Sequence, residues 1–230
     1  MTRVYVAAYR VVKRRTKNGF SLTEILVVMS IMAVLMVMGV SLFRNMGRGE
    51  SQQAVRSLLL AGLNNAHTRA LSSGEPVAMV MTPYDTGREG QLGRSFTLFE
   101  VREDDVTGEF VAEKQLRRWA LLPGRFIFSK DLTVSGEGQN AFDQPAVVSI
   151  EVSDGRSPNK TTVEMPAIIF GGTGSVVWPA GDGELELHAM EGAVVNGQVT
   201  AVGEASSDWR KREVIVIGRQ TGRARFLQTQ

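Results

Sequence analysis

One carboxylate stands at the head of the longest apolar stretch of this 230-residue chain. Glu24 lies five residues beyond Gly19, and every residue of 25–43 is apolar or small. An ionisable group inside a membrane segment costs about 3 kcal/mol and is by default a functional candidate whose partner must be named. The simpler alternative is that Glu24 lies near the membrane interface and extends its charge to water. Glu24 is therefore either an interface residue or half of a charge pair with another molecule.

A second group of charges lies near the C-terminus. Six basic residues stand there against Asp208 and Glu213: Arg210, Lys211, Arg212, Arg219, Arg223 and Arg225. On a strand, Arg223 and Arg225 would share one face about 6.6 Å apart, a spacing that can follow successive phosphates. The structural alternative is that charges on a terminal edge strand prevent aggregation between sheets. Few aromatic residues accompany the basic ones, which disfavours single-strand binding by stacking.

The remaining reactive side chains form no catalytic or metal-binding pattern. His67 and His188 are isolated, and the chain has no cysteine. The acidic residues of 100–105 are candidates for calcium, but they lack the spacing of a dedicated loop, which favours a solvated acidic turn. The glycine-rich stretch 171–174 is flanked by strand-like runs and is interpreted as a turn rather than a phosphate-binding loop. The sequence thus predicts no catalytic residue, no metal site and no cofactor, and a protein that is not an enzyme.

The apolar stretch has the length of a membrane-spanning helix. At about 1.5 Å per residue, 25–43 nearly crosses a hydrocarbon core of about 30 Å. The basic residues that precede it, with no acidic residue among them, are Arg10, Lys13, Arg14, Arg15 and Lys17. By the positive-inside rule they hold the N-terminus in the cytoplasm. The sequence predicts a single membrane span, with the chain beyond Phe43 on the other side.

The helical pattern continues beyond this stretch with a different character. Apolar residues recur every three or four positions up to about Ser73, which is typical of an amphipathic helix. Several glycines predict bending or local melting near Gly39–Gly49. Gly74 and Pro76 then provide a standard helix stop.

The rest of the chain has the pattern of a β domain. Short β-rich runs are separated by clusters of Gly, Pro, Asp and Asn, at 77–81, 95–101, 126–128, 147–152, 167–170, 175–178, 184–189, 213–217 and 223–227. Residues 110–122 are ambiguous and are candidates for another strand pair, whereas 131–145 and 192–207 are expected to be surface excursions. The predicted fold class is α+β, with a long N-terminal helix packed on a C-terminal antiparallel β-sandwich-like domain.

The residues around Glu24 resemble a known processing site. Gly19-Phe20-Ser21-Leu22-Thr23-Glu24, after a basic leader and before an aliphatic helix, resembles the cleavage and methylation site of type IV prepilins and type II secretion pseudopilins. The resemblance implies cleavage after Gly19 by a prepilin peptidase and N-methylation of Phe20. It also implies that Glu24 acts in assembly through the terminal amine of a neighbouring subunit. In low dielectric, such a pair relieves two charges that are each costly alone.

The resemblance divides the chain into four parts. These are a basic leader at 1–19, a transmembrane and assembly helix at 20–43, its amphipathic continuation at 44–73 and a periplasmic β domain at 74–230. The chain has 26 Lys and Arg, and removing the six of the leader leaves 20 against 24 Asp and Glu. The processed chain is mildly acidic, so the pI near 9.1 gives no argument for nucleic acid.

The layout of a long helix leading into a β domain also resembles H-type (GspH-type) minor pseudopilins and FimT-like minor pilins. It implies a subunit that waits in the bacterial inner membrane and enters a type II secretion pseudopilus or a type IV pilus-like filament. The implied partners are the prepilin peptidase and methyltransferase, other pilins or pseudopilins, the inner-membrane assembly platform and membrane lipid. Gly222-Arg223-Ala224-Arg225 resembles the Gly-Arg-x-Arg motif associated with DNA capture in FimT-like pilins. The alternative function is therefore a DNA-binding minor pilin that uses Arg223 and Arg225.

Overall fold

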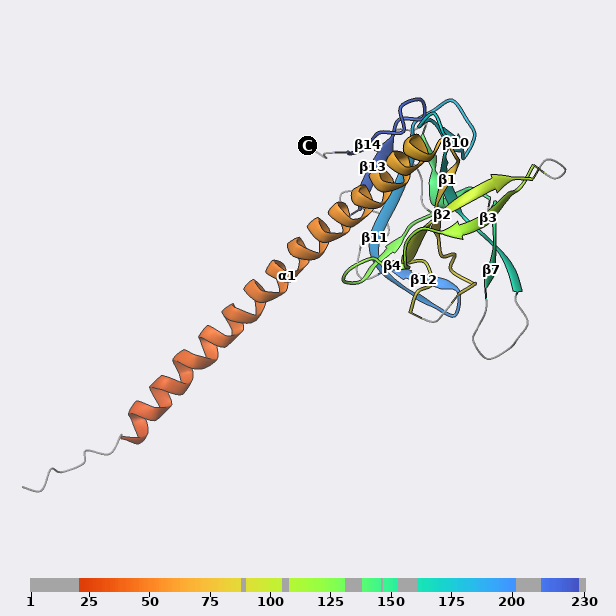
Figure 1. Ribbon diagram of the computed structural model, residues 1–230. Helices are drawn as coiled ribbons and strands as arrows, with labels where there is room; N and C mark the ends of the chain where they lie inside the picture. The colour runs from red at the N-terminus through yellow and green to blue at the C-terminus, as the bar shows by residue number, and fades with distance from the viewer. Residues whose placement is uncertain are drawn as a thin grey trace, which may run out of the picture. The chain divides into compact units, whose positions relative to one another are not determined.

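One long helix begins the part of the chain that the structure describes. The computed structural model describes residues 21–87, 90–104, 108–130, 138–145, 147–152, 161–201 and 212–227, without the side chains of 37–49, 152 and 201. Helix α1 runs from Leu22 to Ser73 (Figure 1). Gly74, with φ of +74°, ends it, and its N–H donates to the Ala70 carbonyl at 2.9 Å. The predicted helix end is confirmed, but the predicted local melting near Gly39–Gly49 is not seen, because the backbone stays helical there.

The chain divides into two compact units, Met1–Gly47 and Arg48–Gln230, whose boundary falls within α1. In the first unit every residue of 21–36 is exposed. The predicted leader at 1–19 and Phe20 lie outside the described residues. Within the described part of the chain, no helix holds a segment long and apolar enough to cross a membrane. The membrane span predicted over 20–43 is therefore not confirmed.

The second unit contains two β-sheets, of which the first has eight strands. Its order is β10-β9-β1-β2-β3-β7-β8, and β4 also pairs with β2. The strands are β1 (Val77–Met81), β2 (Ser95–Glu103), β3 (Phe110–Gln115), β4 (Ala120–Leu121), β7 (Val148–Val152), β8 (Thr161–Met165), β9 (Ala167–Phe170) and β10 (Val176–Trp178). Neighbouring strands are antiparallel except β3 and β7, which run parallel.

The second sheet is organised around its longest strand, β11. Its order is β12-β11-β13-β14, with β5 and β6 also paired to β11. The strands are β5 (Phe126–Phe128), β6 (Gln139–Asn140), β11 (Leu185–Val195), β12 (Gln198–Ala201), β13 (Glu213–Ile217) and β14 (Ala224–Phe226), and a short 3-10 helix, η1 (Ala141–Asp143), follows β6. The β6–β11 pair is parallel and the other described pairs of this sheet are antiparallel. The two parallel pairs of the domain, β3–β7 and β6–β11, depart from the predicted antiparallel pairing, and each joins strands far apart in sequence.

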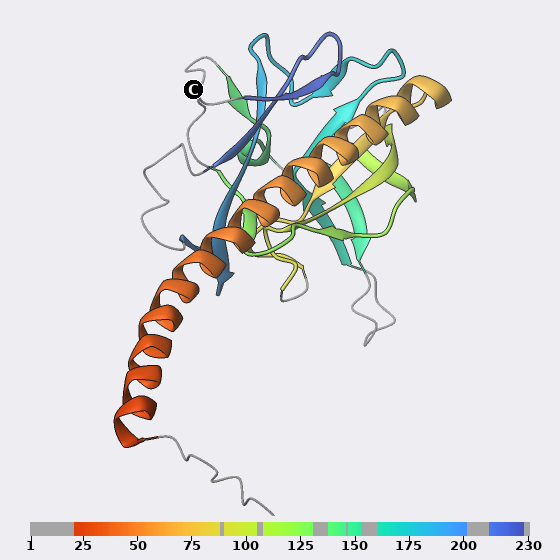
Figure 2. The same ribbon diagram turned by 90° about the vertical axis from the view of Figure 1, so that its left-hand side faces the viewer.

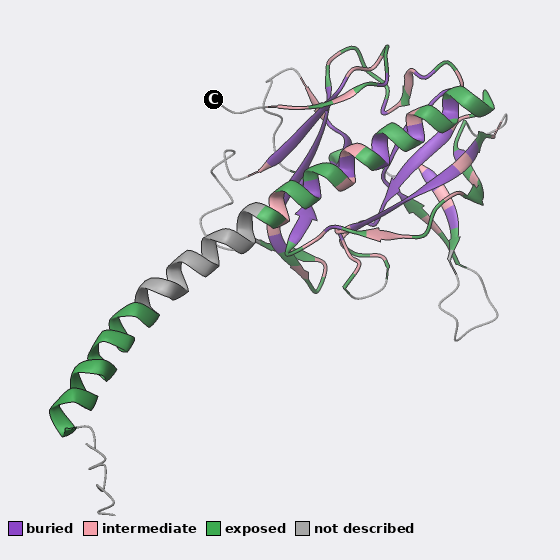
Figure 3. Ribbon diagram, turned by 60° about the vertical axis from the view of Figure 1, so that its left-hand side comes forward, coloured by how far each residue is buried: buried purple, intermediate pink, exposed green. Residues whose placement is uncertain are grey.

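The second half of α1 and both sheets share one hydrophobic core (Figures 2 and 3). The helix contributes one fully buried stripe at spacings of three and four: Val55, Leu59, Leu63, Ala66 and Ala70. Alternate strand residues meet it from the first sheet, such as Met79 and Phe170, and from the second, such as Leu187 and Ile215. The α+β fold class is confirmed.

Strands β1 and β9 of the first sheet are buried on both faces. The other face of this sheet forms a second core cluster that includes Ala78, Val80 and Ile169, and Trp119 and Trp178 pack against this cluster. Strands covered on both sides lose the alternation of apolar and polar residues. This explains why β1 and β9 are apolar at every position.

Several predicted boundaries need correction. The stretch 110–122 forms β3 and β4, which each pair with β2 rather than with one another. In 131–145, residues 140–142 are buried rather than superficial, because Asn140 bonds inward and Phe142 enters the core. In 192–207, β11 continues to Val195 and turns into β12. Strand β8 was missed, because only its last residue, Met165, is buried.

Candidate functional site

The first turn of α1 is capped by two of its own residues. The Ser21 Oγ accepts a hydrogen bond from the Glu24 N–H at 3.2 Å, and the Glu24 Oε2 accepts one from the Ser21 N–H at 3.4 Å. This reciprocal arrangement is a capping box, which satisfies two donors that a helix start leaves free. The charge of Glu24 also interacts favourably with the helix dipole. Sequence reasoning missed this role, although the Ser-x-x-Glu spacing was the signal that could have found it.

Apolar side chains surround this acid on the helix surface. Leu22 is 82% exposed, Ile25 50% and Leu26 61%. Among the described residues, no cation contacts Glu24. An exposed apolar surface of this kind marks a contact with another molecule or a membrane. In an apolar contact of this kind, the Glu24 carboxylate would need a positive charge that the described residues of this chain do not supply.

The C-terminal hairpin of β13 and β14 is tied to α1 by one arginine. The Arg56 Nη2 donates to the Glu213 Oε1 at 3.1 Å and its Nε donates to Oε2, while its guanidinium lies 5.5 Å from the centre of the Phe226 ring. The hydrogen bond to Glu213 raises the pKa of Arg56, although partial burial opposes this shift. The Glu213 side chain is only 4% exposed. Glu213 is thus a structural partner of α1 and not a surface acid beside the basic residues.

Arg219 of the predicted basic group points into the domain. Its Nε donates to the Gly183 carbonyl at 2.6 Å, its Nη1 to the Pro179 carbonyl, and its Nη2 to the Gln139 side chain at 2.5 Å. Burial lowers the pKa of Arg219, and the charge of Asp182 partly opposes that shift. Arg219 therefore joins three segments and is not available to a phosphate.

Arg223 and Arg225 are both exposed, on either side of the half-buried Ala224. They lie at β14, which ends the order of the second sheet. The Arg225 Nη2 donates to the Glu184 Oε1 at 2.8 Å, whereas the Arg223 guanidinium contacts no acid in the described part of the chain. The predicted group of six cations is therefore not one patch as far as the structure describes it, and Asp208, Arg210 and Lys211 lie outside the described residues.

The glycine of the Gly-Arg-x-Arg sequence has a packing role. Gly222 has φ of +62°, and a Cβ at this position would lie 2.1 Å from the Gly174 carbonyl oxygen and 2.5 Å from a carbon of the His67 ring. His67 also meets the Phe170 ring edge-on at 5.8 Å between centroids. The turn at 171–174 and the hairpin loop therefore meet against α1 at His67. This contact explains Gly222 without reference to DNA.

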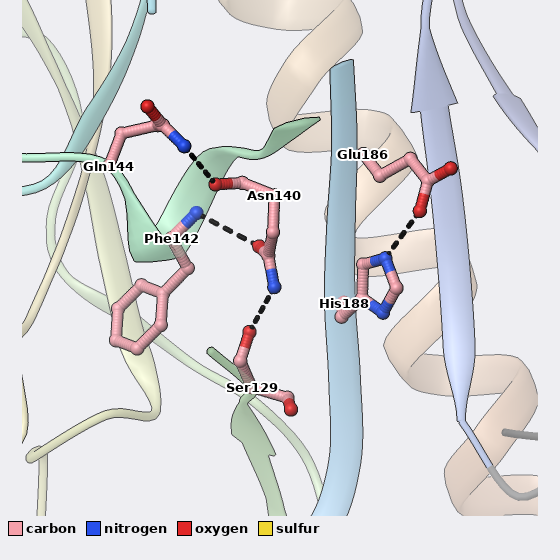
Figure 4. Close-up of polar contacts among 6 residues, drawn as sticks. All are labelled: Ser129, Asn140, Phe142, Gln144, Glu186 and His188. Atoms are coloured by element: carbon pink, nitrogen blue, oxygen red, sulfur yellow. Dashed lines mark hydrogen bonds and ion pairs between the residues drawn. The ribbon is translucent and has the colours of Figure 1, made fainter. Parts of the chain in front are cut away.

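The second histidine makes a buried hydrogen bond to a glutamate. The His188 Nε2 lies 2.7 Å from the Glu186 Oε2, and both side chains are fully buried on one face of β11 (Figure 4). The neighbouring Asn140 side chain donates to the Ser129 carbonyl at 2.7 Å and accepts from the Phe142 N–H at 3.1 Å. The expectation that His188 is isolated is wrong, because residues two apart on a strand share a face. The described residues contain no group of three potential metal ligands.

Of the predicted acidic turn of 100–105, Glu100 and Glu103 lie within β2 and Asp104 follows its end. Glu100 lies 3.8 Å from the Lys114 ammonium on β3. The Asp104 backbone bonds to Gly108 and Glu109 across the hairpin. Asp105 lies outside the described residues.

Comparison with known families bears on the start of the chain. Residues 14–40 match the family model described as the prokaryotic N-terminal methylation motif. The chain carries a prepilin-like N-terminus. A search of curated proteins gives no match. Among solved structures, the chain is similar to the type IV minor pilin FimU of Pseudomonas aeruginosa, with 15% identity, 79% of this chain and 91% of FimU covered, and a TM-score of 0.40.

The prepilin-like motif and the capping box overlap. The matched range contains Ser21, Leu22, Thr23 and Glu24, which form the first turn of α1. Gly19 and Phe20 fall within the same range but outside the described residues. The described part of the prepilin-like motif is therefore a capped helix start with exposed apolar neighbours.

Proposed function

We propose that this prepilin-like chain is a minor subunit of a type IV pilus-like filament or of a type II secretion pseudopilus. The observation that carries the proposal is the methylation motif at 14–40, whose acid, Glu24, caps the start of an apolar, exposed helix. The chain would act by packing against other subunits and not by catalysis. The β domain would remain available for contacts with neighbouring subunits or cargo.

In the proposed assembly pathway, the chain is first inserted in a membrane. The basic segment before Gly19 would stay in the cytoplasm, residues 20–43 would cross the inner membrane, and the β domain would fold in the periplasm. A prepilin peptidase would cut after Gly19 and methylate Phe20. The assembly platform would then lift the processed chain into the filament, where the apolar helix exchanges lipid for the helices of neighbouring subunits.

Glu24 would fix the register in which the helices of neighbouring subunits pack. Cleavage after Gly19 keeps the Phe20–Ser21 peptide bond, so the Ser21 N–H that Glu24 caps survives processing. Among the described contacts, the cap uses only Oε2 of the carboxylate. The other oxygen would then accept the terminal ammonium of a neighbouring Phe20. A carboxylate and an ammonium that meet in low dielectric stabilise each other far more than in water.

Isolation of the filament tests the proposal. Filaments sheared from cells that express the chain should contain it as a minor component, shorter than the translated chain by the 19-residue leader. The matched control is the same preparation from cells without the prepilin peptidase. Absence of the chain from every sheared fraction, with the peptidase active on other prepilins, would remove the proposal.

A second candidate function is DNA binding by the C-terminal hairpin. The observation that favours it is that Arg223 and Arg225 are both exposed beside β14 and that the Arg223 guanidinium has no acid partner in the described part of the chain. The pairing of Arg225 with Glu184 counts against it, because a phosphate would have to compete with that carboxylate.

A further inference from the structure

A pocket of about 300 Å³ in the second unit brings two arginines together. Arg94 precedes β2 and Arg125 precedes β5, and residues 192–194 of β11 complete the wall with Leu92. Among the described residues, none that lines the pocket is acidic. The pocket therefore gathers positive charge beside apolar side chains, where electrostatic interactions are stronger than in open water.

The Arg94 side chain is held in place by the backbone. Its Nη2 donates to the Leu122 carbonyl at 3.0 Å and to the Gly124 carbonyl at 2.8 Å. Its Nε is buried and has no acceptor among the described residues. A buried donor of a charged group that lacks an acceptor is costly, typically by more than a neutral donor. Two backbone carbonyls thus hold Arg94 at the pocket wall, and one of its donors has no acceptor among the described residues.

The Arg125 side chain is exposed, and its guanidinium makes no hydrogen bond or ion pair within the described part of the chain. Its backbone is fixed, because its carbonyl accepts from the Gly192 N–H at 2.8 Å. Three other arginines of the domain are instead paired with acids. Arg56 is bound to Glu213, Arg102 to Glu113 and Arg225 to Glu184.

We propose that this pocket binds an oxyanion, with Arg94 as the fixed donor and Arg125 as the mobile one. Guanidinium groups match the geometry of phosphate and carboxylate oxygens, and such charge-assisted hydrogen bonds are the strong ones in proteins. The oxyanion comes either from a free ion such as inorganic phosphate or from an acidic side chain of a bound peptide. The proposal uses residues outside the prepilin-like motif and is independent of the filament role.

The test measures thermal unfolding of the full chain in detergent while inorganic phosphate is titrated, with chloride replacing it at constant ionic strength. A ligand that binds only the folded state raises the unfolding temperature in a saturable way. Arg125→Gln should raise the half-saturating phosphate concentration about tenfold or more, since one lost charge-assisted bond is worth that factor. The variant should fold normally, because no described hydrogen bond or ion pair of the side chain is lost.

The matched control is Arg117→Gln, which removes the same charge from another exposed arginine and should leave the phosphate response unchanged. A second arm replaces phosphate with a short glutamate peptide and its glutamine counterpart. Saturation by the glutamate peptide at lower concentration than by phosphate assigns the pocket to an acidic side chain, and the reverse assigns it to a free ion. Equal phosphate responses in wild type, Arg125→Gln and Arg117→Gln, or a rise that does not saturate, would overturn the proposal.

Discussion

The Ser21 hydroxyl and the Glu24 carboxylate cap the same turn of α1, each accepting a hydrogen bond from the backbone N–H of the other residue. Glu24 therefore combines a helix cap with a negative charge, and substitutions can separate the two. Glu24→Gln keeps a capping oxygen without the charge, Glu24→Leu removes both, and Ser21→Ala weakens the cap but keeps the charge.

We expect filament assembly to depend on the negative charge of Glu24. Glu24→Gln and Glu24→Leu should both lose at least about 90% of filament incorporation, because one unpaired ammonium in low dielectric costs well over 1.4 kcal/mol, a factor of ten. Ser21→Ala should assemble nearly as well as wild type. The measurement is the share of the chain in sheared filaments relative to the membrane fraction. Normal incorporation of Glu24→Gln would mean that the charge has no role.

The stability of the first turn of α1 should instead depend on the Ser21 cap. Ser21→Ala should destabilise the first turn by about 1 kcal/mol, since a capping hydroxyl is worth that much. Hydrogen exchange of the Thr23 and Glu24 amides in detergent should become several-fold faster in Ser21→Ala and change little in Glu24→Gln. Equal exchange in wild type and Ser21→Ala would show that the capping hydroxyl does not stabilise the turn.

The Arg56–Glu213 pair should stabilise the packing of α1 on the β domain. Arg56→Met leaves the buried Glu213 carboxylate without its cation and should cost about 2 kcal/mol, less than for a fully buried pair because Arg56 is half-exposed. Urea unfolding of the full chain in detergent measures the change. Arg69→Met, on the same helix, breaks only an exposed bond to Asn65 and should cost less than about 0.5 kcal/mol. Equal costs for the two variants would contradict the role given to Glu213.

Gly222 and Gly74 offer a matched pair of glycine substitutions. Both have positive φ, but a Cβ at Gly74 meets nothing within 4 Å, whereas one at Gly222 would overlap the Gly174 carbonyl. Gly74→Ala should therefore cost only the conformational penalty of about 1 kcal/mol, and Gly222→Ala should cost at least about 2 kcal/mol more. The same urea titration measures both. A smaller cost for Gly222→Ala than for Gly74→Ala would contradict the close packing of the hairpin loop against the 171–174 turn and α1.

As a DNA site, the hairpin should respond in opposite directions to two substitutions. Arg223→Ala should weaken duplex binding and reduce its salt dependence by about one phosphate contact. Glu184→Gln should strengthen binding, because it frees Arg225 from its carboxylate. Gel-shift titrations at two salt concentrations measure both, with Arg117→Ala as the charge control. The same affinity for all variants would exclude Arg223 and Arg225 as a DNA site.

Sequence patterns predicted those elements whose local signals agree with their tertiary environment. The stop at Gly74 and Pro76 marked the end of α1, and the apolar runs of β1 and β13 gave their bounds directly. The Asn196-Gly197 turn between β11 and β12 was also readable, since both residues adopt positive φ, as in tight hairpins. The prediction of a surface excursion overlooked this signal.

The remaining features depend on contacts between residues far apart in sequence. Nothing near Glu213 indicates that Arg56, on α1, would neutralise it. Arg219 and Arg225 look alike as cations, and only the fold turns Arg219 inward onto the Gly183 carbonyl. The pocket of Arg94 and Arg125 arises because two separate loops meet beside β11.

Mass spectrometry of the chain's N-terminus, after extraction from membranes of cells that contain an active prepilin peptidase, tests the central claim most directly. The proposal predicts a chain that starts at Phe20 and carries one added methyl group on its amine. A chain that retains residues 1–19, or one cut beyond Phe43, would contradict it.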